Sequence, residues 1–381
     1  MKTENKSRSL IYLDNNATTP VAAEAAAEMG RCLRLCYGNP SSSHAPGMRA
    51  RAAVDRARKQ VAELIGANPD EIIFTSGGTE ANNMAVMGTA FRFKKGHVII
   101  SCIEHPSVSK PVHYLNSLGF RATCLPVDRY GIIDPSLVEK HVRRDTVLIS
   151  IMHSNNETGS IQPVADAGKI ARKRSIVFHC DAAQSVGKVP VNVKKLRVDL
   201  LTVVSHKFYG PKGVGALFVK RGTELKPLLF GASHEKGLRP GTENVAALAG
   251  FGMAAALAKI EMPERVAVMK VLTKKLYDGL RSEIPGIRLN GHPSKRLPNT
   301  VNVSFPGVQG PALLELLKND IAASTGSACH EGSHTPSPVL KAMGASDADA
   351  FSALRLSLGR NNSERQITRA VRLIAKAYRS L

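Results

Sequence analysis

The side chains best suited to chemistry follow runs of apolar residues that have the length of a strand. Five short polar motifs stand in such places: SGGTEANN (76–83), EHPSV (104–108), SNNETG (154–159), DAAQSVGK (181–188) and SHK (205–207). Open α/β sheets bind ligands beyond the carboxyl ends of their parallel strands. We therefore predict that these five motifs meet at one edge of one sheet.

The first motif predicts a phosphate site. Gly77 and Gly78 allow close approach of the backbone, and they precede a segment with helical character. A helix N-terminus presents free N–H groups and the positive end of the helix dipole, which suits a phosphate. The alternative interpretation is a plain helix start with Thr79 as its cap and Glu80 in its first turn.

A carboxylate, a lysine and a histidine follow three other strands. Asp181 ends an apolar run, where its burial is costly without a cation or strong donors, although a helix N-cap is its alternative role. Lys207 follows LLTVV (200–204), a position from which lysine ordinarily points into solvent. His105, taken alone, is more often a hydrogen-bonded structural histidine than a functional one.

The coincidence of these groups at one edge favours pyridoxal 5′-phosphate (PLP) as a cofactor. A lysine binds its aldehyde as a Schiff base, and a carboxylate keeps the pyridine nitrogen protonated so that the ring accepts electrons. A histidine stacks on the ring or moves protons, and Gln184 offers its amide to the same ligand.

The elements that must position these groups alternate along the chain. Near-continuous apolar runs predict strands that are covered on both faces, at 71–76, 97–101, 121–127, 146–153, 175–181, 199–204 and 215–220. Helical patterns at 79–93, 136–144 and 164–174 lie between them. The alternation predicts an α/β fold with a mostly parallel, doubly wound sheet.

A second domain is predicted after this sheet. Residues 241–284 have the pattern of one or two long helices, and beyond Pro285 strands become fewer and polar loops denser. We predict a large domain at 14–261 and a small C-terminal domain at 262–381, which about residues 1–13 join.

Composition narrows the class of protein. The 381 residues contain no run of 18 apolar residues and the N-terminus MKTENKSRSL has no apolar signal region, which predicts a cytoplasmic protein. The net charge of +21 suggests an anionic partner. The basic residues are dispersed, however, and aromatic residues do not alternate with them as in a stacking surface. Tryptophan is absent. Nucleic acid is therefore not predicted as a direct partner.

Six cysteines without a CxxC pair do not predict a disulfide framework. Cys329 differs from the others because it lies among small polar residues in STGSACHEGSH (324–334), which predicts a loop. A metal site formed by Cys329, His330 and His334 is the alternative. It lacks an evident fourth ligand and a standard zinc spacing, so no metal is predicted.

Eight motifs in their order along the chain resemble the cysteine desulfurases, in the class V aminotransferase branch of the fold-type I PLP enzymes. They are YLDNNATTP (12–20), GNPSSSH (38–44), FTSGGTEANN (74–83), NNETG (155–159), DAAQSVGK (181–188), SHKFYGPKGVGALFV (205–219), GLRPGTENV (237–245) and STGSACH (324–330). The resemblance covers about residues 11–360. It implies a large domain with a mostly parallel mixed sheet flanked by helices, a smaller α+β C-terminal domain, and a homodimer.

The resemblance also implies roles for individual residues. Lys207 binds PLP and later moves protons at the substrate α-carbon, Asp181 pairs with the ring nitrogen, and Gln184 hydrogen-bonds the ring oxygen. His105 stacks on the ring and acts as an acid or base. The remaining cofactor contacts are Gly78, Thr79, Ser205 and His206 on the phosphate, Asn156, and Thr242 from the second subunit of the dimer.

Substrate binding and sulfur transfer are implied in the same way. Asn156 and Arg355 hold the substrate carboxylate, and Cys329 attacks the substrate sulfur to give alanine and a persulfide. The sulfur then serves iron–sulfur cluster or thio-cofactor synthesis, delivered to an iron–sulfur scaffold protein or a tRNA-thiolating enzyme.

Two departures from the family pattern affect phosphate binding. Ala232 and Ser233 stand where a run of glycines is common, and Val204 stands where many desulfurases carry a phosphate-binding serine, for which Ser205 is expected to compensate. The alternatives to a cysteine desulfurase are a selenocysteine lyase, a PLP aminotransferase without a thiol step, and a basic scaffold without enzymatic activity. Sulfur and selenium differ too little in size for a pocket to separate them strongly.

Overall fold

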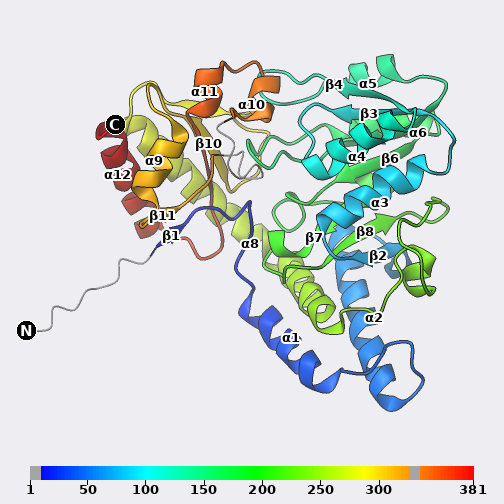
Figure 1. Cartoon of the computed structure of the whole chain (residues 1–381). Helices are drawn as coiled ribbons and strands as arrows, with labels where there is room; N and C mark the ends of the chain where they lie inside the picture. The colour runs from blue at the N-terminus through cyan, green and yellow to red at the C-terminus, as the bar shows by residue number, and fades with distance from the viewer. Residues whose placement is uncertain (1–9, 326–334) are drawn as a thin grey trace, which may run out of the picture.

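A seven-stranded mixed sheet forms the larger part of the molecule (Figure 1). The computed structural model describes residues 10–325 and 335–381. The strand order is β2-β8-β7-β6-β5-β3-β4, and the five strands from β7 to β4 run parallel. β8 is antiparallel to both of its neighbours. The predicted fold class, a mostly parallel sheet flanked by helices, is confirmed.

The strands of this sheet are short and lie close to the predicted ranges. They are β2 (Ile72–Thr75), β3 (His97–Ser101), β4 (Arg121–Leu125), β5 (Thr146–Ser150), β6 (Val177–Asp181), β7 (Leu200–Val204) and β8 (Gly215–Val219). The runs predicted at 121–127 and 146–153 end earlier than expected. Beyond Ser150 the chain leaves the sheet, and the polar motif at 154–159 begins directly after it.

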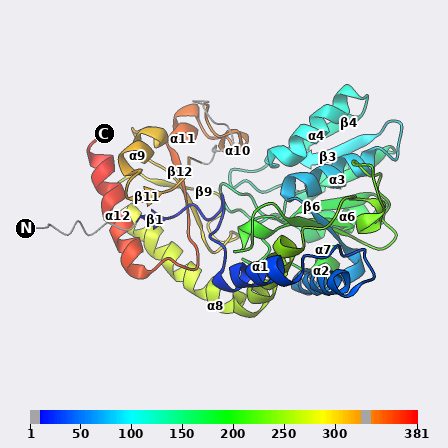
Figure 2. The same ribbon diagram turned by 60° about the horizontal axis from the view of Figure 1, so that its bottom comes forward.

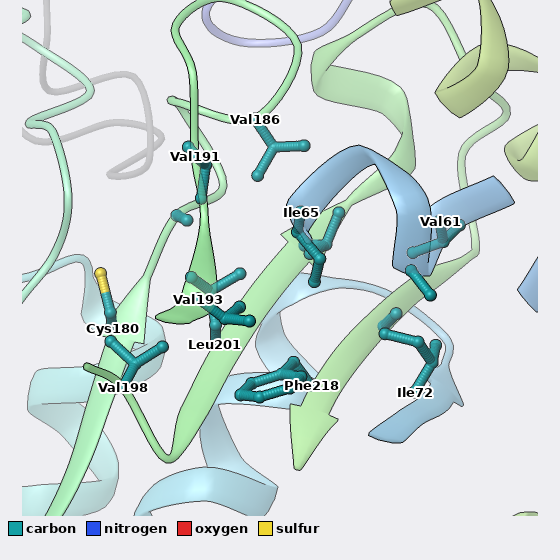
Figure 3. Packing of buried hydrophobic residues seen from close by; sticks show 14 of the residues in the cluster. Val61, Ile65, Ile72, Cys180, Val186, Val191, Val193, Val198, Leu201 and Phe218 are labelled. Atoms are coloured by element: carbon teal, nitrogen blue, oxygen red, sulfur yellow. The ribbon is translucent and has the colours of Figure 1, made fainter. Parts of the chain in front are cut away.

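Each strand is apolar throughout because its alternate side chains enter different hydrophobic cores. Ile72 and Phe74 belong to one cluster with Leu201 and Phe218, whereas Ile73 belongs to another with Leu217. A strand directs successive side chains to opposite faces, so a sheet that is covered on both faces requires continuous apolar runs. Figure 3 shows the first of these clusters, where residues of helix α2 and of the sheet pack together.

Helices cover both faces of the sheet. On one face lie α3 (Gly78–Ala90) and α4 (Pro106–Ser117), and the other face is covered mainly by α2 (Ala45–Ile65), α6 (Val164–Lys173) and the first part of α8 (Val245–Glu283). The other described helices of this part of the chain are α1 (Ala23–Leu35), α5 (Pro135–His141) and α7 (Val193–Leu196), with 3-10 turns η1 (Pro69–Glu71), η2 (Ser205–Lys207) and η3 (His234–Gly237).

The start of α3 differs from the capped helix considered as an alternative. Its N-cap residue is Gly77, and no side chain caps the helix, so Thr79 is not a cap. On the opposite face of the sheet, helix α2 ends at Gly66, whose φ of +71° lies in the left-handed region. These two glycines fix where the helices on either face begin and end.

A second hydrophobic core lies beyond the sheet. Its strands are β9 (Arg288–Asn290), β10 (Thr300–Ser304) and β12 (Ala353–Ser357), and β1 (Ile11–Tyr12) pairs with β11 (Ile321–Ala322). Its helices are α9 (Gly310–Leu317), α10 (Pro338–Ala342), α11 (Asp347–Phe351) and α12 (Glu364–Arg379). Ile11 and Leu13 are buried in this core, although they belong to the N-terminal segment.

Helix α8 belongs to both cores, as Figures 1 and 2 show. Residues up to Ala258 pack in the sheet core and residues from Met269 pack in the second core, with Pro263 between them. The stretch predicted at 241–284 is therefore a single helix. Because the two halves of this helix pack in different cores, a domain boundary near residue 261 is consistent with the structure. The boundary itself stays a prediction.

The length and composition of α8 would also suit a membrane span. Along its course α8 packs closely against α1, α2 and α12. Half of its most apolar window is buried inside the protein, as in a core helix. Its apolar character is accounted for by its position between two hydrophobic cores.

One buried ion pair anchors the segment that carries Thr242. Arg58 Nη1 and Nη2 donate to the two carboxylate oxygens of Glu235 at 2.8 and 2.6 Å. The same carboxylate accepts from the Phe74 N–H at 2.8 Å. The segment after β8 is thus tied to α2 and β2, and this attachment positions the residues that follow Glu235.

Candidate active site

A cavity of about 290 Å³ lies at the carboxyl edge of the parallel strands. The predicted residues that line it are Gly78, Thr79, His105, Asn156, Asp181, Gln184, His206, Lys207 and Arg355. The larger groove, of about 550 Å³, lies at the opposite edge and contains none of them. The chemistry of the lining residues, and not the volume, identifies the smaller cavity as the candidate site.

The phosphate end of the cavity is the start of α3. A Cβ on Gly78 would lie 2.6 Å from Val204 Cγ2, so glycine is what allows this helix to begin against the end of β7. Its N-cap residue, Gly77, supplies no side chain to cap the N–H groups of the first turn, and no other side chain among the described residues is bonded to them. An uncapped helix start that faces a cavity fits a phosphate group.

Ser205 does not take part in this cradle. It is fully buried, its hydroxyl has no hydrogen-bond partner among the described residues, and it does not line the cavity. A Cβ on Gly210 would lie only 2.1 Å from Ser205 Oγ, so the hydroxyl is directed toward Gly210. Val204 lines the cavity, whereas Ser205 does not. The position of the Ser205 hydroxyl therefore does not support the expectation that it replaces a phosphate contact missing at Val204.

Asp181, at the end of β6, is 6% exposed and accepts two hydrogen bonds. Its Oδ1 accepts from the Ala183 N–H at 2.9 Å, and its Oδ2 accepts from Asn82 Nδ2 at 2.7 Å. The carboxylate therefore caps the turn that follows it and also faces the cavity. Residues 183–188 form a turn and not a helix, so Asp181 is not a helix N-cap. Its pairing with the ring nitrogen of the cofactor stays a prediction.

A chain of hydrogen bonds joins Asp181 to His105. Asn82 Nδ2 donates to Ser107 Oγ at 2.8 Å, and the Ser107 N–H donates to His105 Nδ1 at 3.1 Å. Nδ1 is thus an acceptor, which leaves Nε2 to carry the proton of a neutral ring. Burial lowers the pKa of His105, against the raising effect of Asp181, so the ring is neutral at physiological pH.

Asn82 and Ser107 were not predicted as site residues. Both belong to motifs that the sequence singled out, at 76–83 and 104–108. Ser107 stands two residues after His105, and Asn82 lies in the second turn of a helix whose first turn faces the cavity. Their spacing from His105 and from the start of the helix could have indicated that both residues lie at the site.

Lys207 points into the protein and not into solvent. It stands in η2, directly after β7, and its Nζ donates to the main-chain carbonyls of Asn16 and Ala17, each at 2.8 Å. Asn16 also receives Gln184 Nε2 on the same carbonyl, at 2.8 Å. The segment 12–20 therefore holds the predicted catalytic lysine, a role that its motif did not reveal.

Arg355, on β12, brings the second core to the cavity. The residue is 3% exposed, and its guanidinium donates to Asp14 Oδ1 at 2.8 Å and to the Asn156 carbonyl at 3.2 Å. The Arg355 Nε has no partner among the described residues. A buried guanidinium that is held by two groups and retains an unpaired donor suits a carboxylate ligand.

Burial raises the pKa of two carboxyl groups near the cavity. Burial raises the pKa of Glu104 to about 8, although Ser101 Oγ and the Met152 N–H donate to its Oε1. Burial likewise raises the pKa of Glu157 to about 7, although Ser337 Oγ donates to it at 2.6 Å. Glu104 is thus largely protonated at neutral pH.

Among the described residues, two that were predicted for the site, Ser205 and Thr242, do not line the cavity. Thr242 is exposed and does not line the cavity, so its role in a partner's site stays a prediction. Cys329, with His330 and His334, lies outside the described residues. Within 10–325 and 335–381, no group of three His, Cys, Asp or Glu side chains is arranged to hold a metal.

The cavity fits PLP by the chemistry of its donors and acceptors. Its wall offers an uncapped helix start, the Asp181 carboxylate, the Gln184 amide and the Lys207 amine. Lysine, carboxylate and phosphate cradle are the groups that this cofactor requires.

Comparison with known proteins agrees with this geometry. The family model for aminotransferase class-V matches residues 11–370. The chain is 48% identical over 352 residues to cysteine desulfurase IscS from Dictyoglomus turgidum, covering 92% of this chain and 89% of that protein. A solved NifS-like protein superposes with a TM-score of 0.92 at 37% identity, covering 98% of this chain and all of that one. A structure described as SspA in complex with cysteine has a TM-score of 0.81 at 36% identity, with coverages of 91% and 98%.

The position of Val204 leads to a prediction about cofactor affinity. Val204→Ser places a hydroxyl beside the start of α3, where it can donate to the cofactor phosphate. We expect the protein to bind PLP roughly fivefold more tightly, as one added hydrogen bond of about 1 kcal/mol allows. Titration of the cofactor-free protein measures this affinity. Val204→Ala is the control for the lost methyl groups, and equal affinity of the serine and alanine variants would refute the prediction.

The raised pKa of Glu104 predicts a pH dependence of stability. In the unfolded chain this acid ionises near pH 4.5, whereas in the folded protein it stays protonated until about pH 8. Its contribution to stability is complete below pH 4.5 and is lost as pH rises to 8, by up to about 1.4 kcal/mol per pH unit. Glu104→Gln should remove this loss.

Urea unfolding of the cofactor-free protein at pH 5, 6, 7 and 8 measures the effect. The Glu104→Gln curve should fall less steeply with pH than the wild-type curve. The matched control is Glu264→Gln, at an exposed position on α8. Parallel curves for wild type and Glu104→Gln would show that Glu104 ionises normally in the folded protein.

Proposed function

The chain belongs to the aminotransferase class-V family as a PLP-dependent cysteine desulfurase, and we propose that its residues convert L-cysteine to L-alanine while Cys329 receives the sulfur as a persulfide. The observation that carries these residue roles is the convergence of Lys207, Asp181 and Arg355 on one cavity. Asp181 and Lys207 stand at the ends of β6 and β7 in the large sheet, whereas Arg355 lies in the middle of β12 in the second core. No structural requirement of the sheet alone would bring them together.

The residues divide the work of the reaction. The cofactor, when bound, withdraws electrons from the substrate α-carbon, and Asp181 keeps its ring nitrogen protonated. Arg355 and Asn156 orient the substrate carboxylate, and the Lys207 amine moves a proton at the α-carbon. The neutral ring of His105 covers the cofactor.

The thiolate of Cys329 attacks the substrate sulfur. The new S–S bond forms as the C–S bond breaks, and the electron pair of that bond stays with the three-carbon fragment. Protonation of this fragment gives alanine, and the sulfur remains on Cys329 as a persulfide. The thiolate form is required because the thiol is a poor nucleophile.

A direct assay tests the proposed activity. The purified protein with PLP is incubated with L-cysteine and with L-selenocysteine, and alanine is measured. We expect turnover of L-cysteine, and we expect Cys329→Ser to reduce it by at least a hundredfold, since a hydroxyl does not attack sulfur comparably. Turnover of selenocysteine with cysteine inert would identify a selenocysteine lyase instead. Turnover of cysteine that Cys329→Ser leaves unchanged would remove Cys329 from the mechanism.

We propose that the persulfide sulfur passes to an acceptor protein in the cytoplasm, for iron–sulfur cluster or thio-cofactor synthesis. Relatives at 44–48% identity that carry the name IscS support this proposal. The identity of the acceptor protein is a matter for direct transfer experiments with labelled cysteine.

We also propose a homodimer in which Thr242 acts in the partner's site. Large apolar side chains are exposed beside its segment: Phe230 is 89% exposed, Tyr37 73% and Leu33 68%. Ser41 Oγ lies 3.4 Å from His234 Nε2, so the segments that carry these residues adjoin. An exposed apolar surface of this kind favours burial against a second copy.

Complementation between two defective chains tests this arrangement. Lys207→Ala chains and Thr242→Ala chains are co-expressed with different tags, and the mixed dimer is isolated through both tags. If Thr242 acts across the interface, one site of each mixed dimer has both residues, and activity reaches roughly half of wild type. Activity is measured at a PLP concentration that leaves the Thr242→Ala homodimer mostly empty. Activity equal to the mean of the two parent proteins would place Thr242 in the site of its own chain.

A further inference from the structure

Lys188 is a lysine for which the proposed mechanism has no use. It ends the motif at 181–188, and its partly buried side chain reaches two amide oxygens, Asn16 Oδ1 at 2.9 Å and Gln184 Oε1 at 2.8 Å. No carboxylate within the described part of the chain forms an ion pair with it. Burial, together with the nearby Lys207 and Arg355, lowers the pKa of Lys188 well below its usual value. A cation placed without a carboxylate partner is costly to fold, so its position calls for an explanation.

The contacts of Lys188 close a triangle of hydrogen bonds. Lys188 holds the side-chain oxygens of both Asn16 and Gln184, and Gln184 Nε2 donates to the Asn16 main-chain carbonyl at 2.8 Å. That carbonyl is also one of the two acceptors of the Lys207 Nζ. Asn16 and Gln184 line the cavity, whereas Lys188 does not. Lys188 thus lies behind the two residues that face the cofactor and the catalytic lysine.

The chemistry of the partners fixes the orientation of the Gln184 amide. A carbonyl oxygen only accepts, so the group beside Asn16 O must be the Gln184 NH₂, and its oxygen then faces Lys188. The NH₂ group carries two hydrogens, and only one is directed at Asn16 O among the described residues. The second is available at the wall of the cavity.

We propose that Lys188 is a positioning residue, which holds Gln184 and Asn16 so that the Gln184 N–H faces the cofactor and the Asn16 carbonyl receives Lys207. The inference rests on the proposed function only in taking PLP as the occupant of the cavity. Without Lys188, two amide oxygens lose a shared donor, and the Gln184 side chain is free to rotate away from the cavity wall.

A double-mutant cycle tests the proposal. The variants are Lys188→Met, Gln184→Ala and the double variant, and the measurement is the affinity of the cofactor-free protein for PLP. We expect Lys188→Met to weaken binding about tenfold in the wild-type background and less than about threefold in the Gln184→Ala background, because the main partner is then absent. The absorbance maximum of bound PLP should shift in Lys188→Met in the same direction as in Gln184→Ala.

Two further variants separate positioning from folding. Lys188→Arg keeps donors at this place, and we expect it to restore most of the affinity. Lys220→Met removes a lysine bond to Asp199 at the opposite edge of the sheet and should leave PLP binding unchanged. If Lys188→Met does not fold, Lys188→Arg and Lys188→Gln, compared in both Gln184 backgrounds, provide the same cycle.

Two outcomes would overturn the proposal. One is an equal loss of affinity from Lys188→Met in both Gln184 backgrounds. The other is a lower melting temperature of the cofactor-free protein with unchanged PLP affinity and absorbance, which is the result of a purely structural role. None of these measurements involves turnover of cysteine, so a failure of the proposed substrate would leave the test intact.

Discussion

The main-chain carbonyl of Asn16 is the point around which the site is built, because it accepts from both Lys207 and Gln184. The Asn16 side chain donates to Thr300 Oγ1 on β10, and the Asn16 main-chain N–H donates to Ser357 Oγ on β12. One residue that is 1% exposed therefore connects the loops after two parallel strands with the second core. The cavity has its shape because this segment crosses between the two parts of the chain.

Burial determines which groups at the site carry charge. His105 and His206 are neutral at physiological pH, because burial lowers the pKa of both, that of His206 to about 4. Glu104 remains mostly protonated for the corresponding reason. Asp181 and Arg355 line the same cavity and are the groups that we propose for the cofactor ring and the substrate carboxylate.

Much of the site could be predicted from the sequence because strand order did not need to be known. Any set of parallel strands brings its carboxyl ends to one edge, so polar motifs after apolar runs meet wherever each strand lies in the sheet. Asn16 and Lys188 were missed because their roles depend on which atoms of a side chain face which neighbour. The direction of the Ser205 hydroxyl was beyond prediction for a similar reason: one residue of difference in a turn decides whether a hydroxyl faces the cavity or, as here, the backbone at Gly210.

Helix α8 connects the two hydrophobic cores, and a proline lies between the two parts of the helix that pack in them. It spans about 58 Å at the usual rise per residue, with one end embedded in each core. Pro263 stands between the two embedded parts, where the missing N–H removes one bond of the helix and lowers its resistance to bending. Lys207 follows β7 in the large sheet and Arg355 lies on β12 in the second core, so a bend of α8 at Pro263 would change the distance between the amine and the guanidinium. Replacement of Pro263 would therefore act on the width of the cavity without changing a residue that lines it.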